Sequence, residues 1–103
     1  VYANEYIKNN GALSLSSDNG SATFSINAYH GNSSGVCNLE GVAESVGTGS
    51  RQRNRWAYSD PSSACVLVIS ELSNGSINVK TRSCESYCGV SAVGSMDGEY
   101  RKK

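Results

Sequence analysis

The residues of this chain best suited to bond formation, metal binding or catalysis are four cysteines and one histidine. Structural zinc sites use two close cysteine pairs, or a cysteine pair with a histidine pair. Cys84 and Cys88 form a single close pair at an unsuitable spacing, and His30 has no second histidine to join it. The cysteines therefore predict disulfides rather than a metal site, and no cofactor is expected.

Strand parity favours one of the three ways in which four cysteines can pair. Cys37 and Cys65 are each in phase with the apolar residues of their own predicted strand, so both are expected to point inward. Cys84 is out of phase with the apolar residues before it and is expected to leave the core face, within reach of Cys88 across a short turn. The favoured pairing is Cys37–Cys65 with Cys84–Cys88. Pairing of Cys65 with Cys84 or Cys88, which would join the ends of one hairpin, stays open.

Catalysis finds little support in these residues. His30 is the only histidine that could activate a nucleophile. Glycosidases need two acidic residues that flank the bond to be cleaved, but the spacing of the acidic residues selects no pair. We therefore expect a binding protein and not an enzyme.

Arginine is concentrated at one place, the stretch RQRNRW that ends at residue 56. Glycine and serine precede it, so residues 46–55 are expected to form a loop that is first Gly-rich and then Arg-rich. Arginine and aromatic side chains are enriched at binding hot spots, although a solvated loop beside a core tryptophan would look the same. The expected partner-binding residues are His30, Arg51, Arg53, Arg55 and Trp56.

The elements that must position these residues are predicted to be β-strands. Residues 65–72, CVLVISEL, are rich in β-branched and aliphatic side chains, and residues 77–81, INVKT, alternate between apolar and polar. Asn74-Gly75 between them is a strong hairpin signal, and residues 66–69 are expected to be buried. A second hairpin is expected around a turn at residues 17–20. Gly41, in the middle of a predicted strand, suggests a bulge or tight bend.

Turn signals recur at nearly even intervals, and no stretch has the apolar spacing of a long helix. This pattern is typical of an antiparallel sandwich or barrel. We count seven or eight strands in meander order, and a meander of that number can close into a barrel without exposed edges. The prediction is a single disulfide-stabilised all-β domain, a small meander barrel or sandwich, over residues 1–103.

The composition indicates which classes of partner are unsuitable and which compartment suits the chain. Nine basic and nine acidic residues give a net charge of zero, which argues against nucleic-acid or anionic-membrane binding. No apolar run approaches the ~18 residues of a membrane span. An even cysteine count in a small polar chain favours an oxidising compartment, so we expect a periplasmic or secreted protein. The chain begins at Val1, and removal of an export signal stays open.

Five short sequences occur in order between residues 36 and 100: VCNLEGVA, W-x-Y, CVLVI, C-x-x-x-CG and DGEY. In this order they resemble the C-terminal pattern of small exported proteobacterial proteins that are grouped with periplasmic lysozyme inhibitors. The resemblance implies a disulfide-bonded β-barrel or sandwich whose loops plug the active-site cleft of a lysozyme. The chain lacks the Ser-Gly-x-x-Tyr and Lys-Gly-x-x-Ala motifs of the c-type inhibitor family, so no inhibitory residue is carried over.

The expected function is therefore binding and inhibition of a peptidoglycan-cleaving enzyme, with that hydrolase as the protein partner. A carbohydrate- or small-ligand-binding β-barrel without catalysis is the alternative, and Trp56 and the tyrosines would serve it.

Overall fold

The computed structural model describes residues 2–18, 20–29, 36–47, 52–88 and 95–102, and for residues 2, 3, 18, 52 and 53 it describes the backbone alone. Eight strands and one short 3-10 helix occur in this part of the chain. In chain order they are β1 (Tyr2–Lys8), β2 (Gly11–Asp18), β3 (Ser21–Tyr29), β4 (Val36–Ser45), β5 (Gln52–Ser59), β6 (Val66–Leu72), β7 (Ile77–Arg82), η1 (Glu85–Tyr87) and β8 (Gly98–Lys102).

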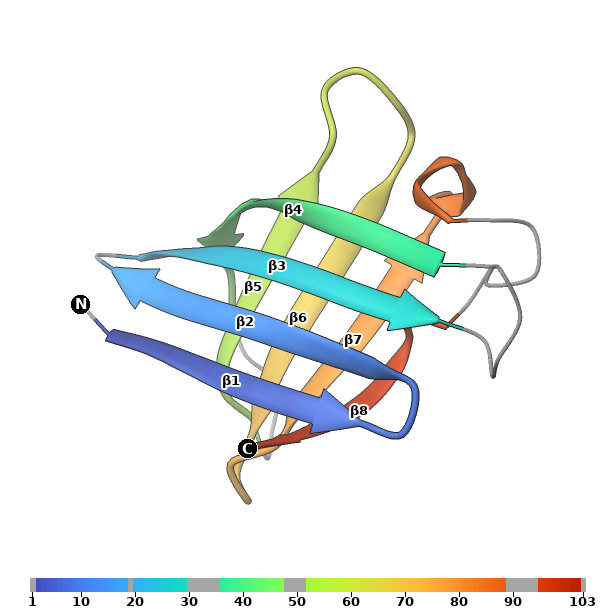
Figure 1. Cartoon of the computed structure of the whole chain (residues 1–103). Coiled ribbons are helices and arrows are strands. Elements are labelled where there is room, and N and C mark those ends of the chain that lie inside the picture. Colours follow the sequence, from blue (N-terminus) through green and yellow to red (C-terminus); the bar gives the residue numbers. More distant parts are fainter. Residues whose placement is uncertain (1, 19, 30–35, 48–51, 89–94, 103) are drawn as a thin grey trace.

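Each strand pairs antiparallel with the next, and β1 pairs with β8, so the meander closes into a barrel. Figure 1 shows β1 to β4 lying across β5 to β8. The closing ladder is short, and Lys8 supports it by donating hydrogen bonds to the carbonyl oxygens of Ser95 and Asp97, at 2.5 and 2.6 Å. The predicted all-β meander is confirmed as an eight-stranded closed barrel. No helix of the described residues is long and apolar enough to cross a membrane.

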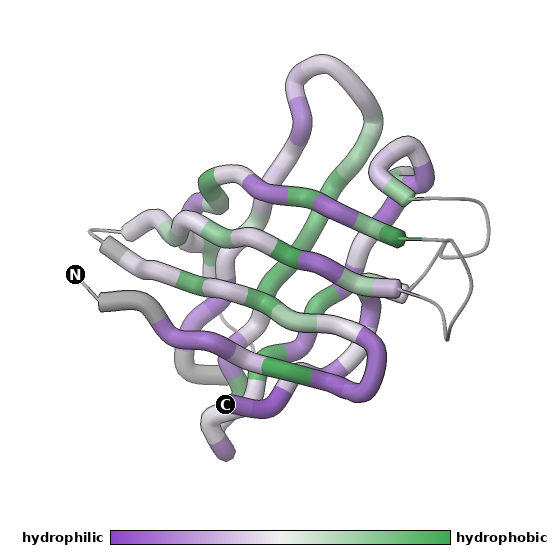
Figure 2. The backbone as a smooth tube through the Cα atoms, in the orientation of Figure 1, coloured by the Kyte–Doolittle hydropathy of each residue, from purple (hydrophilic) through white to green (hydrophobic). Residues whose placement is uncertain are grey.

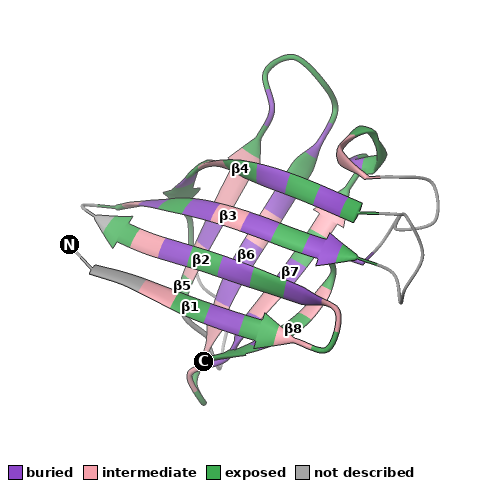
Figure 3. Cartoon of the chain, viewed as in Figure 1, coloured by how far each residue is buried: buried purple, intermediate pink, exposed green. Residues whose placement is uncertain are grey.

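The core fills the inside of the barrel because successive side chains of a strand point to opposite faces. Along β3 the buried residues alternate with exposed or half-buried ones, and Figures 2 and 3 show the same alternation of hydropathy and burial on neighbouring strands. The large side chains inside include Phe24, Trp56, Met96 and Tyr100, all at most 6% exposed. The interior is therefore packed with side chains.

A glycine with a left-handed φ angle lies in each of two tight hairpins. Gly75 has a φ of 91° and Gly20 a φ of 87°, and such angles favour glycine because it has no Cβ. The Asn74-Gly75 turn joins β6 to β7 as predicted. The second hairpin is tighter than expected, since Asp18 still pairs with Ser21.

Two details of the predicted strands are corrected. In β6 only Leu67 and Ile69 of residues 66–69 are fully buried, whereas Val66 is 37% exposed, because the outer face of a barrel strand meets solvent. The predicted loop at residues 46–55 is wrong for its last four residues, which belong to β5. Their partner is β6: Arg55 pairs with Ser70, and Asn54 pairs with Glu71 and donates a 2.7 Å hydrogen bond to its carboxylate.

The disulfides are Cys37–Cys88 and Cys65–Cys84, with Cα–Cα distances of 4.0 and 4.4 Å. The favoured pairing of Cys37 with Cys65 and of Cys84 with Cys88 is wrong, and the alternative bond of Cys65 to Cys84 is confirmed. The reason is Ser83, whose φ of 60° is left-handed. This residue ends the alternation of β7 and turns the Cys84 side chain inward, where it is 4% exposed.

Candidate partner-binding loop

The connection between β5 and β6, residues 60–65, projects beyond the end of the barrel (Figure 1). We call it the DPSSAC loop. Its two ends, Asp60 and Cys65, are buried, and the four residues between them, Pro61 to Ala64, are all exposed. The exposed side chains are small, so the loop presents a narrow tip with hydroxyl and backbone polar groups.

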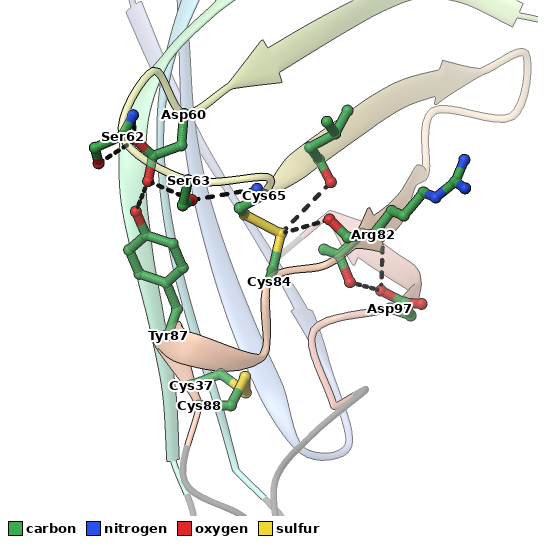
Figure 4. Close-up of a disulfide and its surroundings, with 12 residues drawn as sticks. Cys37, Asp60, Ser62, Ser63, Cys65, Arg82, Cys84, Tyr87, Cys88 and Asp97 are labelled. Carbon is green, nitrogen blue, oxygen red and sulfur yellow. Dashed lines mark hydrogen bonds between the residues drawn. A yellow bond between two sulfur atoms is a disulfide. The ribbon is translucent and has the colours of Figure 1, made fainter.

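The Asp60 carboxylate organises the loop (Figure 4). Its Oδ1 accepts hydrogen bonds from the backbone N–H of Ser62 at 2.9 Å and from the Ser62 hydroxyl at 2.8 Å. Its Oδ2 accepts one from the Ser63 hydroxyl at 3.0 Å and one from the Tyr87 hydroxyl. Each carboxylate oxygen thus accepts two hydrogen bonds, and side-chain bonding of this kind is what makes aspartate favourable in turns.

Backbone hydrogen bonds and a disulfide close the base of the DPSSAC loop. The Asp60 N–H donates to the Cys65 carbonyl at 3.0 Å, and the Cys65 N–H donates to the Ser63 hydroxyl oxygen at 3.2 Å. The Cys65–Cys84 bond then attaches the loop to the residue that precedes η1. The loop is therefore held in one conformation before any partner is present.

Tyr87 comes from η1, which lies between the two disulfides. The Tyr87 N–H donates to the Cys84 carbonyl, and the Cys88 N–H donates to the Glu85 carbonyl, both at 3.0 Å. Cys88 is bonded to Cys37 at the start of β4. The half-buried Tyr87 side chain is thus fixed relative to the barrel and can hold the loop in place.

The same contacts set the acidity of both groups. Hydrogen bonds from the Tyr87 hydroxyl, and then from Ser62, hold the pKa of Asp60 well below its usual range. The pKa of Tyr87 is raised because its hydroxyl donates to that carboxylate. Asp60 is therefore ionised, and its carboxylate accepts hydrogen bonds from donors of the protein itself. Its role is to shape the loop rather than to transfer protons.

Of the expected binding residues, the structure describes the side chains of Arg55 and Trp56 alone. Trp56 is only 6% exposed and belongs to the core. Arg55 lies half-buried on β5, and its Nε finds no hydrogen-bond partner among the described residues. Only the backbone of Arg53 is described, within β5, and His30 and Arg51 lie outside the described residues.

The strand ends nearest to His30 and Arg51 lie far apart. Tyr29, before His30, pairs with Val36 at the start of β4, whereas the ladder with β5 is at the other end of β4, at Ser45 and Trp56. Nine residues of strand, ~30 Å at ~3.4 Å per residue, separate these two positions of β4. The described strand end before His30 therefore lies at the end of β4 opposite to the β4–β5 ladder.

The DPSSAC loop was not predicted as a binding site from the sequence. An aspartate two residues before a serine is a signal for a side-chain-bonded turn, and Asp60 and Ser62 have that spacing. Nothing local points to Tyr87, which follows Asp60 by 27 residues.

The described residues also form hollows elsewhere on the surface. One of about 570 Å³ lies over the outer face of β2 to β4, where Ser14, Thr23 and Ser25 line it. Among the described residues, no three of His, Cys, Asp or Glu are grouped so that they could hold a metal ion.

No family model, no curated protein and no solved structure matches this chain. The likeness to periplasmic lysozyme inhibitors therefore rests on the short sequences between residues 36 and 100 alone.

Proposed function

We propose that this is an exported protein that binds a peptidoglycan-cleaving enzyme and inhibits it by inserting the DPSSAC loop into the enzyme's cleft. The observation that carries the proposal is the loop itself: an exposed tip, Pro61 to Ala64, on a base fixed by the Asp60 hydrogen bonds and the Cys65–Cys84 disulfide. The resemblance in residues 36–100 supports the choice of partner.

Preorganisation is the physical reason why such a loop suits an inhibitor. Ordering a flexible side chain at an interface costs about 0.5–1.5 kcal/mol, and proline and alanine lose almost no side-chain entropy on burial. A loop that is already ordered and carries small side chains therefore keeps most of its contact energy as affinity. Serine hydroxyls and backbone groups can also hydrogen-bond in a cleft that is built for sugar hydroxyls and carboxylates.

Two further features support an exported binding protein. Both disulfides suit an oxidising compartment. The barrel interior is filled by Phe24, Trp56, Tyr100 and their neighbours, so a small ligand would have to bind in an open hollow on the outside of the barrel, such as the one over β2 to β4. These features favour a protein partner over the ligand-binding alternative.

The test is a binding assay against a panel of lysozymes and peptidoglycan amidases, with two tryptophan variants. Ala64→Trp enlarges the tip of the DPSSAC loop, and Ser73→Trp enlarges an exposed turn at the other end of β6. We expect Ala64→Trp to weaken binding by about tenfold or more, or ~1.4 kcal/mol, and Ser73→Trp to change it by less than about twofold.

A third variant, Arg51→Ala with Arg53→Ala and Arg55→Ala, tests the competing surface. If this variant loses affinity while Ala64→Trp binds like the wild type, the arginines make the contact and the loop does not. If no hydrolase in the panel binds the wild-type protein, the inhibitor proposal is wrong.

A further inference from the structure

Charge is segregated between the two halves of the barrel although the whole chain is neutral. Strands β1 to β4 carry four acidic residues and one lysine, a formal net charge of −3. Strands β5 to β8 carry six basic and two acidic residues, a formal net charge of +4. The zero net charge of the sequence therefore hides two surfaces of opposite sign.

The outer face of β4 combines acidic and exposed apolar side chains. Val36 is 44% exposed, Val42 52% and Val46, just after the strand, 40%. Glu40 and Glu44 are exposed on the same face of β4, on either side of Val42. We call these five residues the acidic stripe. Exposed apolar side chains that cluster on one surface commonly mark an interaction site.

On the side of β5, the strand β4 is paired over only a short part of its length. Residues 36–44 of β4 pair with β3, but β5 pairs only with Glu44 and Ser45. The acidic stripe therefore lies beside the place where the β4–β5 ladder stops.

A surface of opposite sign lies on β6 and β7. Val66 pairs with Arg82, and Val68 pairs with Lys80. Val66, Lys80 and Arg82 are exposed, and Val68 is half-buried. We call these four residues the basic patch. It has the same make-up as the acidic stripe, valines next to charges, with the sign of the charges reversed.

The charges of both surfaces have no ion-pair partner in the part of the chain that the structure describes. Glu40, Glu44, Lys80 and Arg82 form no ion pair with any other described residue. The stripe and the patch lie on different sides of the barrel, with β5 between them in strand order, so one copy cannot bring its own two surfaces together.

We propose that the acidic stripe of one copy binds the basic patch of a second copy. The Cα atoms of outward-facing neighbours on a strand are ~7 Å apart, so Val42 has a glutamate at that spacing on each side. On the patch Arg82 and Lys80 lie on the strand next to Val66 and Val68, and paired Cα atoms of adjacent strands are ~5 Å apart. Val42 can therefore meet the valines of the patch while its neighbouring glutamates face the cations, and apolar contact beside paired opposite charges is typical of protein interfaces.

A second copy fits better than an anionic membrane or polymer. Such a surface would engage Lys80 and Arg82 but would leave the acidic stripe, with its three exposed valines, without a partner. The contact joins two different surfaces, so it is heterologous and adds copies in a ring or in an open row. Exposed charge pairs are weak and screened by salt, so the association is concentration- and salt-dependent.

The experiment is analytical ultracentrifugation of the full chain over a range of concentrations. At low ionic strength the weight-average mass should rise with concentration above the monomer value of 10.9 kDa. With about 0.5 M salt, where the Debye length is only ~4 Å, it should return toward the monomer mass. A wild-type protein that stays monomeric at every concentration in low salt overturns the proposal.

Charge-reversed variants make the test specific to these surfaces. Glu40→Lys with Glu44→Lys makes both surfaces basic, and Lys80→Glu with Arg82→Glu makes both acidic. Each variant alone should remain monomeric, and an equal mixture of the two should associate again. Association of either variant alone at wild-type strength, or a mixture that stays monomeric, contradicts the proposal.

Two controls complete the design. Val42→Ser should weaken self-association without changing any charge, and the circular dichroism of every variant should match that of the wild type. Vesicles containing phosphatidylglycerol test whether the basic patch binds an anionic membrane instead. If the wild-type protein is monomeric and binds the vesicles through Lys80 and Arg82, the self-association proposal is wrong and the basic patch is a membrane-binding surface.

Discussion

The ring of Tyr58 lies against Gly41 so closely that a Cβ at position 41 would be 2.7 Å from Tyr58 Cε1. Tyr58 also packs edge-to-face on Phe24, with ring centroids 5.2 Å apart. These contacts fill the space where β4 and β5 diverge. No bulge occurs at Gly41, because Gly41 pairs in regular register with Phe24. The glycine instead leaves room for the tyrosine ring.

Gly41→Ala should therefore destabilise the protein. The methyl group would overlap a ring that is held by Phe24, and overpacking of this kind costs about 1–3 kcal/mol of unfolding free energy. Gly47→Ala is the matched control, because a Cβ at Gly47 would meet no atom within 4 Å. Urea unfolding of the two variants measures the difference.

A Tyr58→Ala background separates steric overlap from any other effect of alanine. There the added methyl group has space, and the penalty for Gly41→Ala should largely disappear. An equal penalty with and without Tyr58, or the same stability for the alanine variants at 41 and 47, would show that the ring does not require glycine.

The strands, their order and the Asn-Gly turns could be predicted because their signals are local. Alternation along residues 21–29 marks both faces of β3, and the glycine at position 75 marks its own turn. Two features could not be predicted from local signals. A single left-handed residue, Ser83, reversed the parity argument for Cys84. The backbone of residues 52–55 follows a partner strand that begins more than ten residues later, so its loop-like composition was misleading.

The disulfide pairing can be checked by digestion without reduction. Cleavage after lysine and arginine places Cys37 in fragment 9–51, Cys65 in fragment 56–80, and both Cys84 and Cys88 in fragment 83–101. We expect all three fragments to remain linked. Release of 83–101 as a separate fragment would instead indicate a Cys84–Cys88 bond.

A second protease distinguishes the two pairings that link three fragments. Cleavage after Glu85 separates Cys84 from Cys88. Mass spectrometry should then find the Cys84 fragment joined to the Cys65 fragment, and the Cys88 fragment joined to the Cys37 fragment. Crossed products would contradict the structure.

The Asp60 hydrogen bonds predict a pH dependence of stability. The pKa of this carboxyl is lowered in the folded protein, so its contribution to stability is present above the unfolded-state pKa of about 4. That contribution is lost as pH falls toward the lower folded-state value. Asp60→Asn should therefore lower the melting temperature at pH 7, and the difference from wild type should shrink in acid. A difference that is constant from pH 7 to pH 2 would show that the charge of Asp60 is not involved.

At the alkaline side the relevant group is Tyr87, whose pKa is raised in the folded protein. Its contribution is present below the unfolded-state pKa of about 10 and is lost as pH rises through the folded-state value. Melting curves of Tyr87→Phe should therefore lie below those of the wild type at neutral pH and approach them in strong alkali. Parallel curves up to the alkaline limit would contradict this assignment.

The Tyr87 hydroxyl should also control how firmly the DPSSAC loop is held. Tyr87→Phe removes one of the four hydrogen bonds to the Asp60 carboxylate and leaves Pro61 to Ala64 unchanged. Loop opening precedes cleavage by an unspecific protease, so the rate of cutting at residues 61–64 should rise by about tenfold or more, as expected for the loss of one hydrogen bond to a charged group.

Tyr29→Phe is the matched control for that experiment, since it removes a hydroxyl that donates to the Asn9 carbonyl, away from the loop. Equal rates of cutting in the two variants would show that Tyr87 does not hold the loop.

Tyr87→Phe leaves the exposed residues of the loop tip in place, so any loss of affinity for a hydrolase in this variant would measure the ordering of the loop rather than the loss of a contact. Preorganisation predicts that the affinity falls together with protease resistance. Unchanged affinity in a variant whose loop is cut faster would mean that the partner, and not Asp60, fixes the loop.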